Sequence, residues 1–362
     1  MQRLTASIAA LALFAPSAHA ARLPATPATI AKVLSRARGG DTLLLAPGLY
    51  AALVLKGRTF APRLTITSSD PAQPATLADV NMMGVQGLTF RQLEIVTTGR
   101  GWASLAQKSK GITYDHVAVH GSLDNDAGND GGGLSFLNTS DVTVTNSDFT
   151  QLRQGASFGA NPTPIANITV AGNNIHGVMK SGLVFAGASQ VTIACNRISD
   201  IRVVPPQHPD AIQFFTTGTT TAAHDINISD NVILRGDGQA TQGIFLRDQV
   251  GALPYERVVI ANNLIVGTGY GGIYVMGAKG LQVTGNELVS RPGKENATWI
   301  LIQGAEDVRS EGNRAVRITY DKVSNLSEQD NVEVKPVNDE GAAAVARRKA
   351  MHPKACSAPP GP

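Results

Sequence analysis

The sequence predicts an all-β fold, a right-handed parallel β-helix in which the chain winds as a solenoid behind a short N-terminal capping helix. Three observations predict it: a short motif recurs along the chain, a second apolar stretch precedes most copies, and the composition favours strands and tight turns. The 362 residues are 43% hydrophobic and only 16% charged, with 37 glycines. A chain of this length and apolar content can bury a large core, so a disordered protein is excluded.

The recurring motif reads apolar, any residue, apolar, any residue, turn residue, Asn, any residue, apolar. Its copies start at Ile168 (ITVAGNNI), Val191 (VTIACNRI), Ile226 (INISDNVI), Val258 (VVIANNLI), Leu281 (LQVTGNEL) and, in degenerate form, Val308 (VRSEGNRA) and Leu326 (LSEQDNVE). Three upstream copies keep the apolar positions without the asparagine and start at Leu88, Ile112 and Val142. Alternating apolar residues predict a strand with one face turned inward.

The two positions that follow each of these strands predict a turn and a ladder. The turn position holds Gly172, Cys195, Asp230, Asn262, Gly285, Gly312 and Asp330, which apart from Cys195 are types that tolerate left-handed backbone. The next position holds Asn173, Asn196, Asn231, Asn263, Asn286, Asn313 and Asn331. If successive copies stack, we expect these amides to bond to one another and to the turn backbone.

A second short strand precedes the motif. Its copies begin at Gly133 (GLSF), Gly155 (GASF), Gly182 (GLVF), Ala211 (AIQF), Gly243 (GIFL), Gly272 (GIYV) and Trp299 (WILI). We expect the first and third apolar residues to point inward, as with Leu183 and Phe185 or Ile212 and Phe214, and the residue between them to point outward. Two or three such strands in each turn of roughly 20 to 35 residues predict stacked β-helical coils.

The first 20 residues are expected to be a signal peptide. Arg3 precedes an apolar run, and Ala18-His19-Ala20 is typical of a cleavage site, which would place the mature start near Ala21. No later segment is apolar for long enough to span a membrane. We therefore expect an exported bacterial protein, either secreted or periplasmic, with no membrane span.

The remaining chain divides into a β-helix domain over residues 21–336 and a flexible C-terminal tail over 337–362. Near the start, residues 29–38 place Ile30, Val33 and Leu34 on one face of a short helix, which predicts a cap on the open end of the core. The tail is rich in alanine, proline and charge and ends in SAPPGP. We expect this tail to be loosely structured.

Charge and cysteine content restrict the partners. The formal net charge is +3, so there is no electrostatic argument for nucleic acid as a partner. The two cysteines, Cys195 and Cys356, are free to form a disulfide outside the cytoplasm, and the sequence leaves open whether they do. We expect a monomer whose partner is a polysaccharide substrate.

A known superfamily combines these features. A helical cap, then residues 40–50 (GDTLLLAPGLY), then repeating coils of the V-T-I-x-x-N-x-I kind, resemble the secreted pectate-lyase-like β-helix superfamily. The resemblance covers about residues 25–335. It implies the fold but not one reaction, since that superfamily includes polysaccharide lyases, glycoside hydrolases, epimerases, esterases, tailspikes and adhesins.

Polar residues on neighbouring coils mark the candidate site. Side chains in equivalent outward positions of successive coils form rows, and the coils near residues 177, 202 and 237 are the polar ones. The candidate catalytic residues are Lys180, His208, Asp210 and Arg247, and the candidate substrate-binding residues are Gln213, Gln242, Asp248, Tyr270 and Tyr274. We expect Gln242 to stack on Asp210, and Arg247 to lie two residues beyond the row of Gln213.

These residue types fit β-elimination from an acidic, uronate-containing polysaccharide. The reaction needs an amide or cation for the carboxylate, a base for the adjacent proton and an acid for the leaving oxygen. Arg247, Gln213 or Gln242 could bind the carboxylate, and Lys180 or His208 could be the base. Lys180-Ser181-Gly182 is also similar to a segment of alginate-lyase and chondroitinase-B-like enzymes, which implies that Lys180 is the base.

Two other functions stay open. A glycoside hydrolase would need two carboxylates, for which Asp210 with Asp248 or Asp237 are the nearby candidates. A non-catalytic adhesin or polysaccharide-binding scaffold would use the same surface without turnover. Individual residues also have structural interpretations, in which Arg247 pairs with Asp248 and Tyr274 stacks on Phe245 and Phe215.

No metal or other cofactor is assigned. The segment from Asp124 to Asp130 (DNDAGND) is dense in oxygen ligands that suit calcium, but it does not match an EF-hand loop. We therefore keep calcium as an alternative and predict a metal-free reaction.

Overall fold

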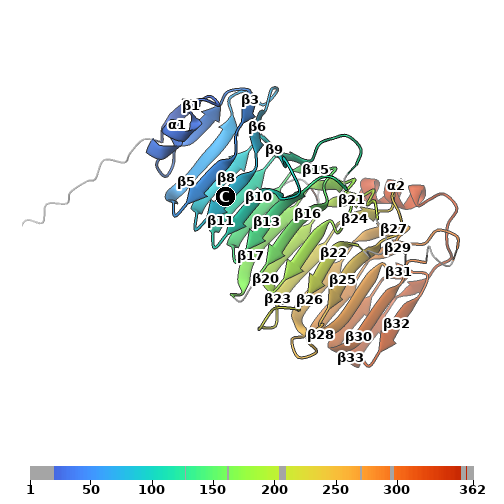
Figure 1. The fold of residues 1–362 in the computed structure, drawn as a ribbon. Coiled ribbons are helices and arrows are strands. Elements are labelled where there is room, and N and C mark those ends of the chain that lie inside the picture. Colours follow the sequence, from blue (N-terminus) through green and yellow to red (C-terminus); the bar gives the residue numbers. More distant parts are fainter. Residues whose placement is uncertain are drawn as a thin grey trace, which may run out of the picture.

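The computed structural model describes residues 20–126, 128–160, 163–203, 209–269, 271–293, 297–351 and residue 356. In this part the chain winds as a solenoid, and Figure 1 shows the coils stacked in sequence order along one axis. Each complete coil supplies one short strand, or one half of a longer strand, to each of three faces. Strands of faces A and B are joined in one 22-stranded sheet, and face C is a separate 12-stranded sheet.

Face A contains the strands that carry the candidate site. They are β4 (Leu53–Lys56), β7 (Val80–Met83), β10 (Trp102–Gln107), β13 (Gly132–Leu137), β16 (Gln154–Gly159), β19 (Leu183–Ala186), β22 (Asp210–Phe215), β25 (Gln242–Arg247), the first halves of β28 (Ile273–Thr284) and β30 (Ile300–Glu311), and β32 (Ile318–Asp321).

Face B contains the strands of the recurring motif. They are β1 (Arg22–Ala25), β2 (Thr42–Leu45), β5 (Thr59–Ser68), β8 (Gln86–Arg91), β11 (Lys110–Asp115), β14 (Ser140–Thr145), β17 (Ile165–Ala171), β20 (Ala188–Ala194), β23 (His224–Ser229), β26 (Tyr255–Ala261), the second halves of β28 and β30, and β33 (Ser324–Gln329).

Face C contains short strands that follow each turn. They are β3 (Gly48–Tyr50), β6 (Ala75–Ala78), β9 (Glu94–Val96), β12 (Ala118–His120), β15 (Asp148–Thr150), β18 (Asn174–His176), β21 (Arg197–Ser199), β24 (Val232–Leu234), β27 (Leu264–Val266), β29 (Glu287–Val289), β31 (Arg314–Ala315) and β34 (Val332–Glu333).

Successive coils pair in parallel and in register. Leu183 pairs with Ile212, and Ile212 pairs with Ile244 on the next coil. These side chains are at most 1% exposed, as are Phe185 and Phe214, so the predicted inward positions are confirmed. Inward aromatic rings form a continuous row through the core, stacked except at the edge-to-face pairs Tyr114–Phe136 and Phe214–Tyr255. In order, the row is Phe90, Tyr114, Phe136, Phe158, Phe185, Phe214 and Tyr255.

The asparagine ladder is also confirmed. Each ladder asparagine from Asn173 to Asn313 donates its Nδ2–H to the Oδ1 of the next one, at 2.9–3.0 Å, and Asn331 ends the row. The backbone N–H of each donor bonds to the same oxygen, as for Asn231 and Asn263 at 3.0 Å. The turn residues before the ladder are left-handed, including Cys195 with φ 58°. Each amide therefore ties one coil to the next inside the core.

A short helix lies at the N-terminal end of the solenoid. Helix α1 (Ile30–Arg36) buries Leu34, and Ile30 and Val33 pack against the core cluster. This agrees with the predicted helix and its apolar face, whereas its role as a cap stays a prediction. Neither helix in the described chain has the length and apolar character needed to span a membrane.

The C-terminal tail was predicted wrongly over residues 342–351, because helix α2 (Ala342–Met351) occupies them. Figure 1 shows α2 beside the face C strands of the middle coils. Ala344 is 3% exposed and belongs to a cluster with Leu264, Val266 and Val289. Alanine, arginine, lysine and methionine have high helix propensity, and this composition outweighed the charge and proline content from which a tail was predicted.

The disulfide that the sequence left open is present. Cys195, in the turn after β20, is bonded to Cys356, which lies 161 positions later in the chain. The bond therefore ties the segment that follows α2 to a coil in the middle of the solenoid. The predicted signal peptide, residues 1–20, lies outside the described residues except for Ala20.

Candidate functional site

A groove of about 370 Å³ lies on the outer side of face A, across β16, β19 and β22. Its polar lining consists of Gln154, Ser157, Lys180, Ser181 and Gln213. Its apolar lining consists of Val184, Pro209 and Phe215. These residues come from three successive coils, so stacking in register assembles the groove.

Two rows of equivalent positions build the groove. Ser157, Val184 and Gln213 pair in register, each flanked by inward residues, and so they face outward. Gln154 and Ser181 each lie two residues before the first inward residue of their strand. Strand alternation thus turns Ser157, Val184 and Gln213 outward, whereas Gln154 and Ser181 join the lining from the edge where their strands begin.

Lys180 lies in the bend that precedes β19. Its backbone N–H donates to the carbonyl of Arg153 at 2.8 Å, which fixes the bend against the previous coil. Its side chain is half-buried and lines the groove. Lys180 is the only cationic side chain among the described residues that line the groove.

Ser181 links the groove to the strand behind it. Its hydroxyl accepts the backbone N–H of Asp210 at 3.2 Å. The same hydroxyl lies 3.5 Å from Oε1 of Gln213, toward which it can donate. Ser181 thereby orients the Gln213 amide, so that the NH₂ group of that amide is available to a ligand in the groove.

Asp210 lies behind this wall rather than in it. It is 2% exposed, and its Oδ1 is buried without a hydrogen-bond partner among the described residues. Burial raises the pKa of its carboxyl group from 3.8 to about 8. At neutral pH the protonated, uncharged form is therefore favoured. Gln242 pairs with Asp210 in register, as predicted.

The other predicted residues lie farther along the same face. Arg247 pairs with Phe215, two residues beyond the Gln213 row as predicted, and it is exposed. Tyr274 lies two coils beyond Gln213. Its ring stacks on that of Phe245, with centroids 6.0 Å apart, which agrees with the structural alternative considered for this residue. Face A thus carries Gln213, Arg247 and Tyr274, but of these three only Gln213 lines the groove.

Asp248 has a structural role that the sequence did not reveal. Its Oδ1 accepts hydrogen bonds from the Thr216 hydroxyl at 2.9 Å and from the N–H of Gly251 at 2.9 Å. Its Oδ2 accepts the N–H of Leu253 at 2.9 Å. The carboxylate is engaged by the turn that follows β25, and no ion pair with Arg247 occurs among the described residues.

Two predicted residues, His208 and Tyr270, lie outside the described residues. The sequence-based reasoning missed Gln154, Ser157, Val184 and Phe215 as groove residues and used Ser181 only as part of a motif. A signal for Gln154 and Ser181 existed, because they occupy the same position relative to their strands as Asp210 and Gln242. Aligning the copies of the repeat is enough to place these four residues in one row.

The Asp124–Asp130 segment closes on itself. Oδ1 of Asp124 accepts the N–H of Asp126 at 2.8 Å, and its Oδ2 accepts the Asn129 amide at 2.7 Å. Oδ1 of Asp130 accepts the N–H of Ser122 at 2.6 Å. In the described part of the chain, no three His, Cys, Asp or Glu side chains are grouped so as to hold a metal ion.

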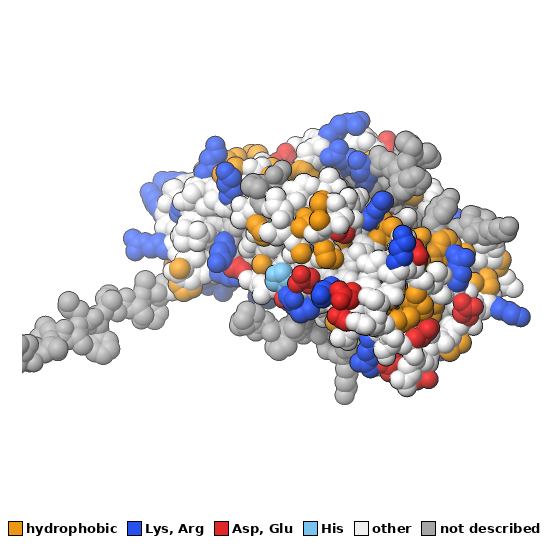
Figure 2. All heavy atoms as spheres, turned by 90° about the horizontal axis from the view of Figure 1, so that it is seen from below, with side chains coloured by type: hydrophobic (Ala, Val, Ile, Leu, Met, Phe, Trp, Pro, Cys, Tyr) orange, Lys and Arg blue, Asp and Glu red, His pale blue; other side chains and the backbone are white. Residues whose placement is uncertain are grey.

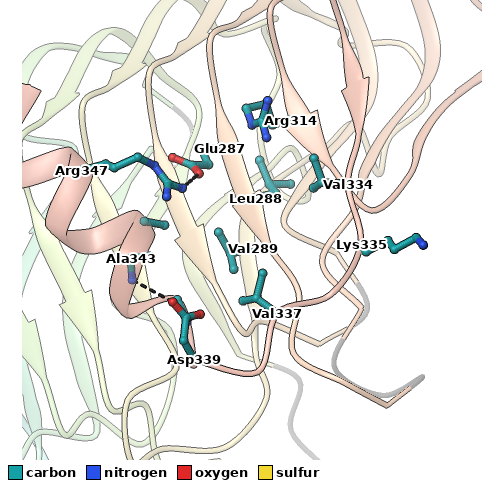
Figure 3. A pocket seen from close by; sticks show the side chains of 12 residues that line it. Glu287, Leu288, Val289, Arg314, Val334, Lys335, Val337, Asp339, Ala343 and Arg347 are labelled. Carbon is teal, nitrogen blue, oxygen red and sulfur yellow. Dashed lines mark hydrogen bonds and ion pairs between the residues drawn. The ribbon is translucent and has the colours of Figure 1, made fainter.

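A second cavity, of about 110 Å³, lies between α2 and face C. Figure 3 shows Leu288, Val289 and Val337 along it, with Arg347 of α2 paired to Glu287. Asp339 accepts the N–H of Ala343 at 2.9 Å at the start of the helix. The central side chains are apolar, so this cavity fits packing of the helix better than binding of a polar sugar.

Charge is mixed over the surface. Figure 2, which views the molecule from below, shows acidic and basic side chains side by side over much of this face. Ion pairs of this kind include Arg257 with Asp225, at 2.6 Å between Nε and Oδ1, and Lys279 with Glu306 at 3.3 Å. This distribution agrees with the small net charge of the sequence.

Comparison with known proteins defines the class. A family model described as the right-handed β-helix region matches residues 107–288, and the chain therefore belongs to the right-handed β-helix family. No curated protein sequence matches the chain.

Solved structures share the fold at low sequence identity. The Agl-KA catalytic domain is 13% identical, with 84% of this chain and 62% of that chain covered and a TM-score of 0.56. A GH136 lacto-N-biosidase from Eubacterium ramulus is 11% identical, with 86% and 68% covered and a TM-score of 0.53. An alginate lyase from Paenibacillus sp. str. FPU-7 is 14% identical, with 87% and 99% covered and a TM-score of 0.46. At these identities the likeness shows the fold alone.

Proposed function

We propose that this protein is an exported polysaccharide lyase that cleaves an acidic, uronate-containing polysaccharide by β-elimination in the face A groove. One observation carries the proposal: the described lining combines one lysine with two glutamines and two serines, and it includes no carboxylate. A groove with cationic and amide donors and no acid suits an anionic sugar, since a carboxylate there would repel it.

The groove residues have distinct roles in this reaction. The Gln213 amide donates to the carboxylate of the bound uronate and stabilises the charge that develops on it. Lys180 removes the proton on the carbon next to that carboxylate. The electron pair then forms a carbon–carbon double bond, the bond to the 4-linked oxygen breaks, and this oxygen takes a proton from water in the open groove.

The disulfide between Cys195 and Cys356 supports export, because such bonds persist in oxidising compartments. Together with the expected signal peptide, it supports a secreted or periplasmic location. We propose that the protein acts there as a monomer on a polymer that is too large to enter the cell.

A hydrolase remains the second candidate, because Asp210 is a protonated carboxyl group of the kind that a general acid requires. Such an enzyme also needs a second free carboxylate, and Asp248 is engaged by backbone N–H groups. Asp237 is exposed in a separate loop. The groove therefore supports elimination better than hydrolysis, and a non-catalytic scaffold would bind the same polymers without product.

The test is turnover of a panel of uronate polymers and neutral polysaccharides, with ultraviolet absorbance for the unsaturated product and mass spectrometry of the fragments. We expect the unsaturated product, and Lys180→Ala should lower kcat/KM by about 10²- to 10⁴-fold, the contribution of a general base. Lys279→Gln removes a charge from another face and serves as the control. Shortened polymers without the chromophore would overturn elimination, and Asp210→Asn would then test hydrolysis.

A further inference from the structure

The outer side of face A continues beyond the groove as partly exposed aromatic side chains. In the first outward row, Gln213 pairs with Phe245, and Phe245 pairs with Tyr274. In the second row, Phe215 pairs with Arg247. We call Phe215, Phe245, Tyr274 and Arg247 the aromatic ledge. Phe215 also lines the groove, so that the ledge and the groove form one continuous surface.

We propose that the aromatic ledge is a second saccharide-binding region, which holds further uronate units of the polymer on the C-terminal side of the groove, with Arg247 binding a carboxylate. This inference rests on the proposed function for its substrate class. It reassigns Arg247, which the sequence suggested as catalytic, because Arg247 lies outside the groove that holds Lys180.

The rings have the geometry of a stacking surface. The rings of Phe245 and Tyr274 are 6.0 Å apart and inclined by 28°, and both side chains are half-buried. Their strand neighbours Leu246 and Val275 are fully buried, so alternation directs both rings outward. An aromatic ring with one free face can cover the C–H face of a sugar ring.

The spacing of the coils matches a polymer that runs along the solenoid axis. Neighbouring strands lie ~4.8 Å apart, which is close to the length of one pyranose unit in an extended chain. The path from Lys180 through Phe215 and Phe245 to Tyr274 crosses four successive coils. A polymer bound along it would be held by several sugars and cleaved away from its end.

Arg247 supplies the charge that makes the ledge selective for acidic sugars. It is exposed, and within the described chain no carboxylate forms an ion pair with it. Its sequence neighbour Asp248 is already bonded to Thr216 and to backbone N–H groups. A guanidinium with free donors binds a carboxylate through two parallel hydrogen bonds.

The experiment measures binding without turnover. Lys180→Ala protein would be titrated calorimetrically with polymannuronate, polyguluronate, polygalacturonate and a neutral β-glucan, and then with the trisaccharide and octasaccharide of whichever polymer binds. Arg247→Gln and Tyr274→Leu are added singly in this background. Lys279→Gln is the matched control, because it removes a positive charge from the same strand, β28, as Tyr274 but outside face A.

We expect Arg247→Gln and Tyr274→Leu each to weaken octasaccharide binding about tenfold, the effect of one lost charge-assisted or stacking contact. Trisaccharide binding should change much less, and the control should bind like the parent. Octasaccharide binding that neither variant alters would overturn the ledge, as would a parent that binds no uronate polymer.

Preferred binding of the neutral glucan that only Tyr274→Leu weakens would overturn the assignment of Arg247 to a carboxylate. Failure of the proposed reaction is distinguishable from these outcomes. In that case ledge variants still weaken binding, while the unsubstituted enzyme releases no unsaturated product.

Discussion

Asp210 is a buried acid beside the groove, and its surroundings make the stability of the protein depend on pH. Burial raises its pKa to about 8, against 3.8 for an ordinary exposed aspartate. Between these values the folded state holds a proton that the unfolded state has released. Stability therefore falls as pH rises through this window, because ionisation favours the unfolded chain.

Asp210→Asn should remove this dependence, because asparagine resembles the neutral acid in shape and cannot ionise. Relative to this variant, we expect the parent to lose roughly 3 kcal/mol of unfolding free energy between pH 5 and pH 8. Urea unfolding at both pH values measures it. Asp237→Asn, at an exposed position, is the control, and equal pH dependence in parent and Asp210→Asn would contradict the prediction.

The burial of Asp210 could be predicted only in part from the repeat. Asp210 lies two residues before the inward Ile212, so strand alternation favours an inward position, but Gln154 and Gln242 hold the same position on their coils and are only half-buried. Its polarity favoured the interpretation as an outward site residue. The role of Asp248, by contrast, depends on a turn whose backbone N–H groups converge on it, and no residue pattern predicts that geometry.

At the scale of elements, the asparagine ladder holds the coils together through buried polar groups. Asn231 is fully buried, donates to the carbonyl of Ile193 at 2.9 Å and to Asn263 at 3.0 Å, and accepts from Asn196. Its Oδ1 also accepts the backbone N–H of Asn196 at 3.0 Å, so both N–H groups and both lone pairs of the amide are used within the core. Removing it leaves several buried partners without a bond.

Asn231→Ala should therefore destabilise the protein by about 3 kcal/mol or more, since each buried polar group left unpaired costs about 1–3 kcal/mol. Asn331 ends the ladder and is only half-buried, so Asn331→Ala should cost about 1 kcal/mol. Thermal and urea unfolding of the two variants measure the difference. Similar losses at both positions would mean that the ladder does not depend on burial.

Helix α2 is the element that the sequence-based prediction missed, and side-chain contacts hold it in place. Arg348 bonds to Asp230 and to the carbonyl of Asn262, which are both turn residues of the repeat. Arg347 pairs with Glu287 of β29. These partners lie 60 to 118 positions away in the chain, so they emerge only when the coils are stacked.

The disulfide should determine how firmly α2 is held. We expect Cys195→Ser together with Cys356→Ser to lower the unfolding free energy by about 2–4 kcal/mol. Without the bond, which joins residues 161 positions apart, the unfolded chain is no longer restricted to a closed loop. Trypsin should then cut faster at Arg347 or Arg348. Rates of cleavage with and without a reducing agent measure it, and equal rates would show that the helix is held without the bond.

At the scale of the whole molecule, the repeat predicted the architecture well because the same few positions recur in every coil. Inward rows, the ladder and the left-handed turns each follow from one motif, and the structure has all of them. The groove was predicted only in part, at Lys180 and Gln213. The other lining residues become neighbours only when successive coils stack, and a motif within a single coil does not show which side chains will then meet.

A solenoid of this kind has two ends from which its coils can fray one at a time, since each coil contacts only its neighbours. The bond between Cys195 and Cys356 changes this for the C-terminal half, because it links a middle coil to the segment beyond α2. A coil of this half that frays therefore stays tethered at both ends of the closed loop. The coils that carry the aromatic ledge belong to this tethered part, so fraying there leaves them close to the positions that they hold in the folded solenoid.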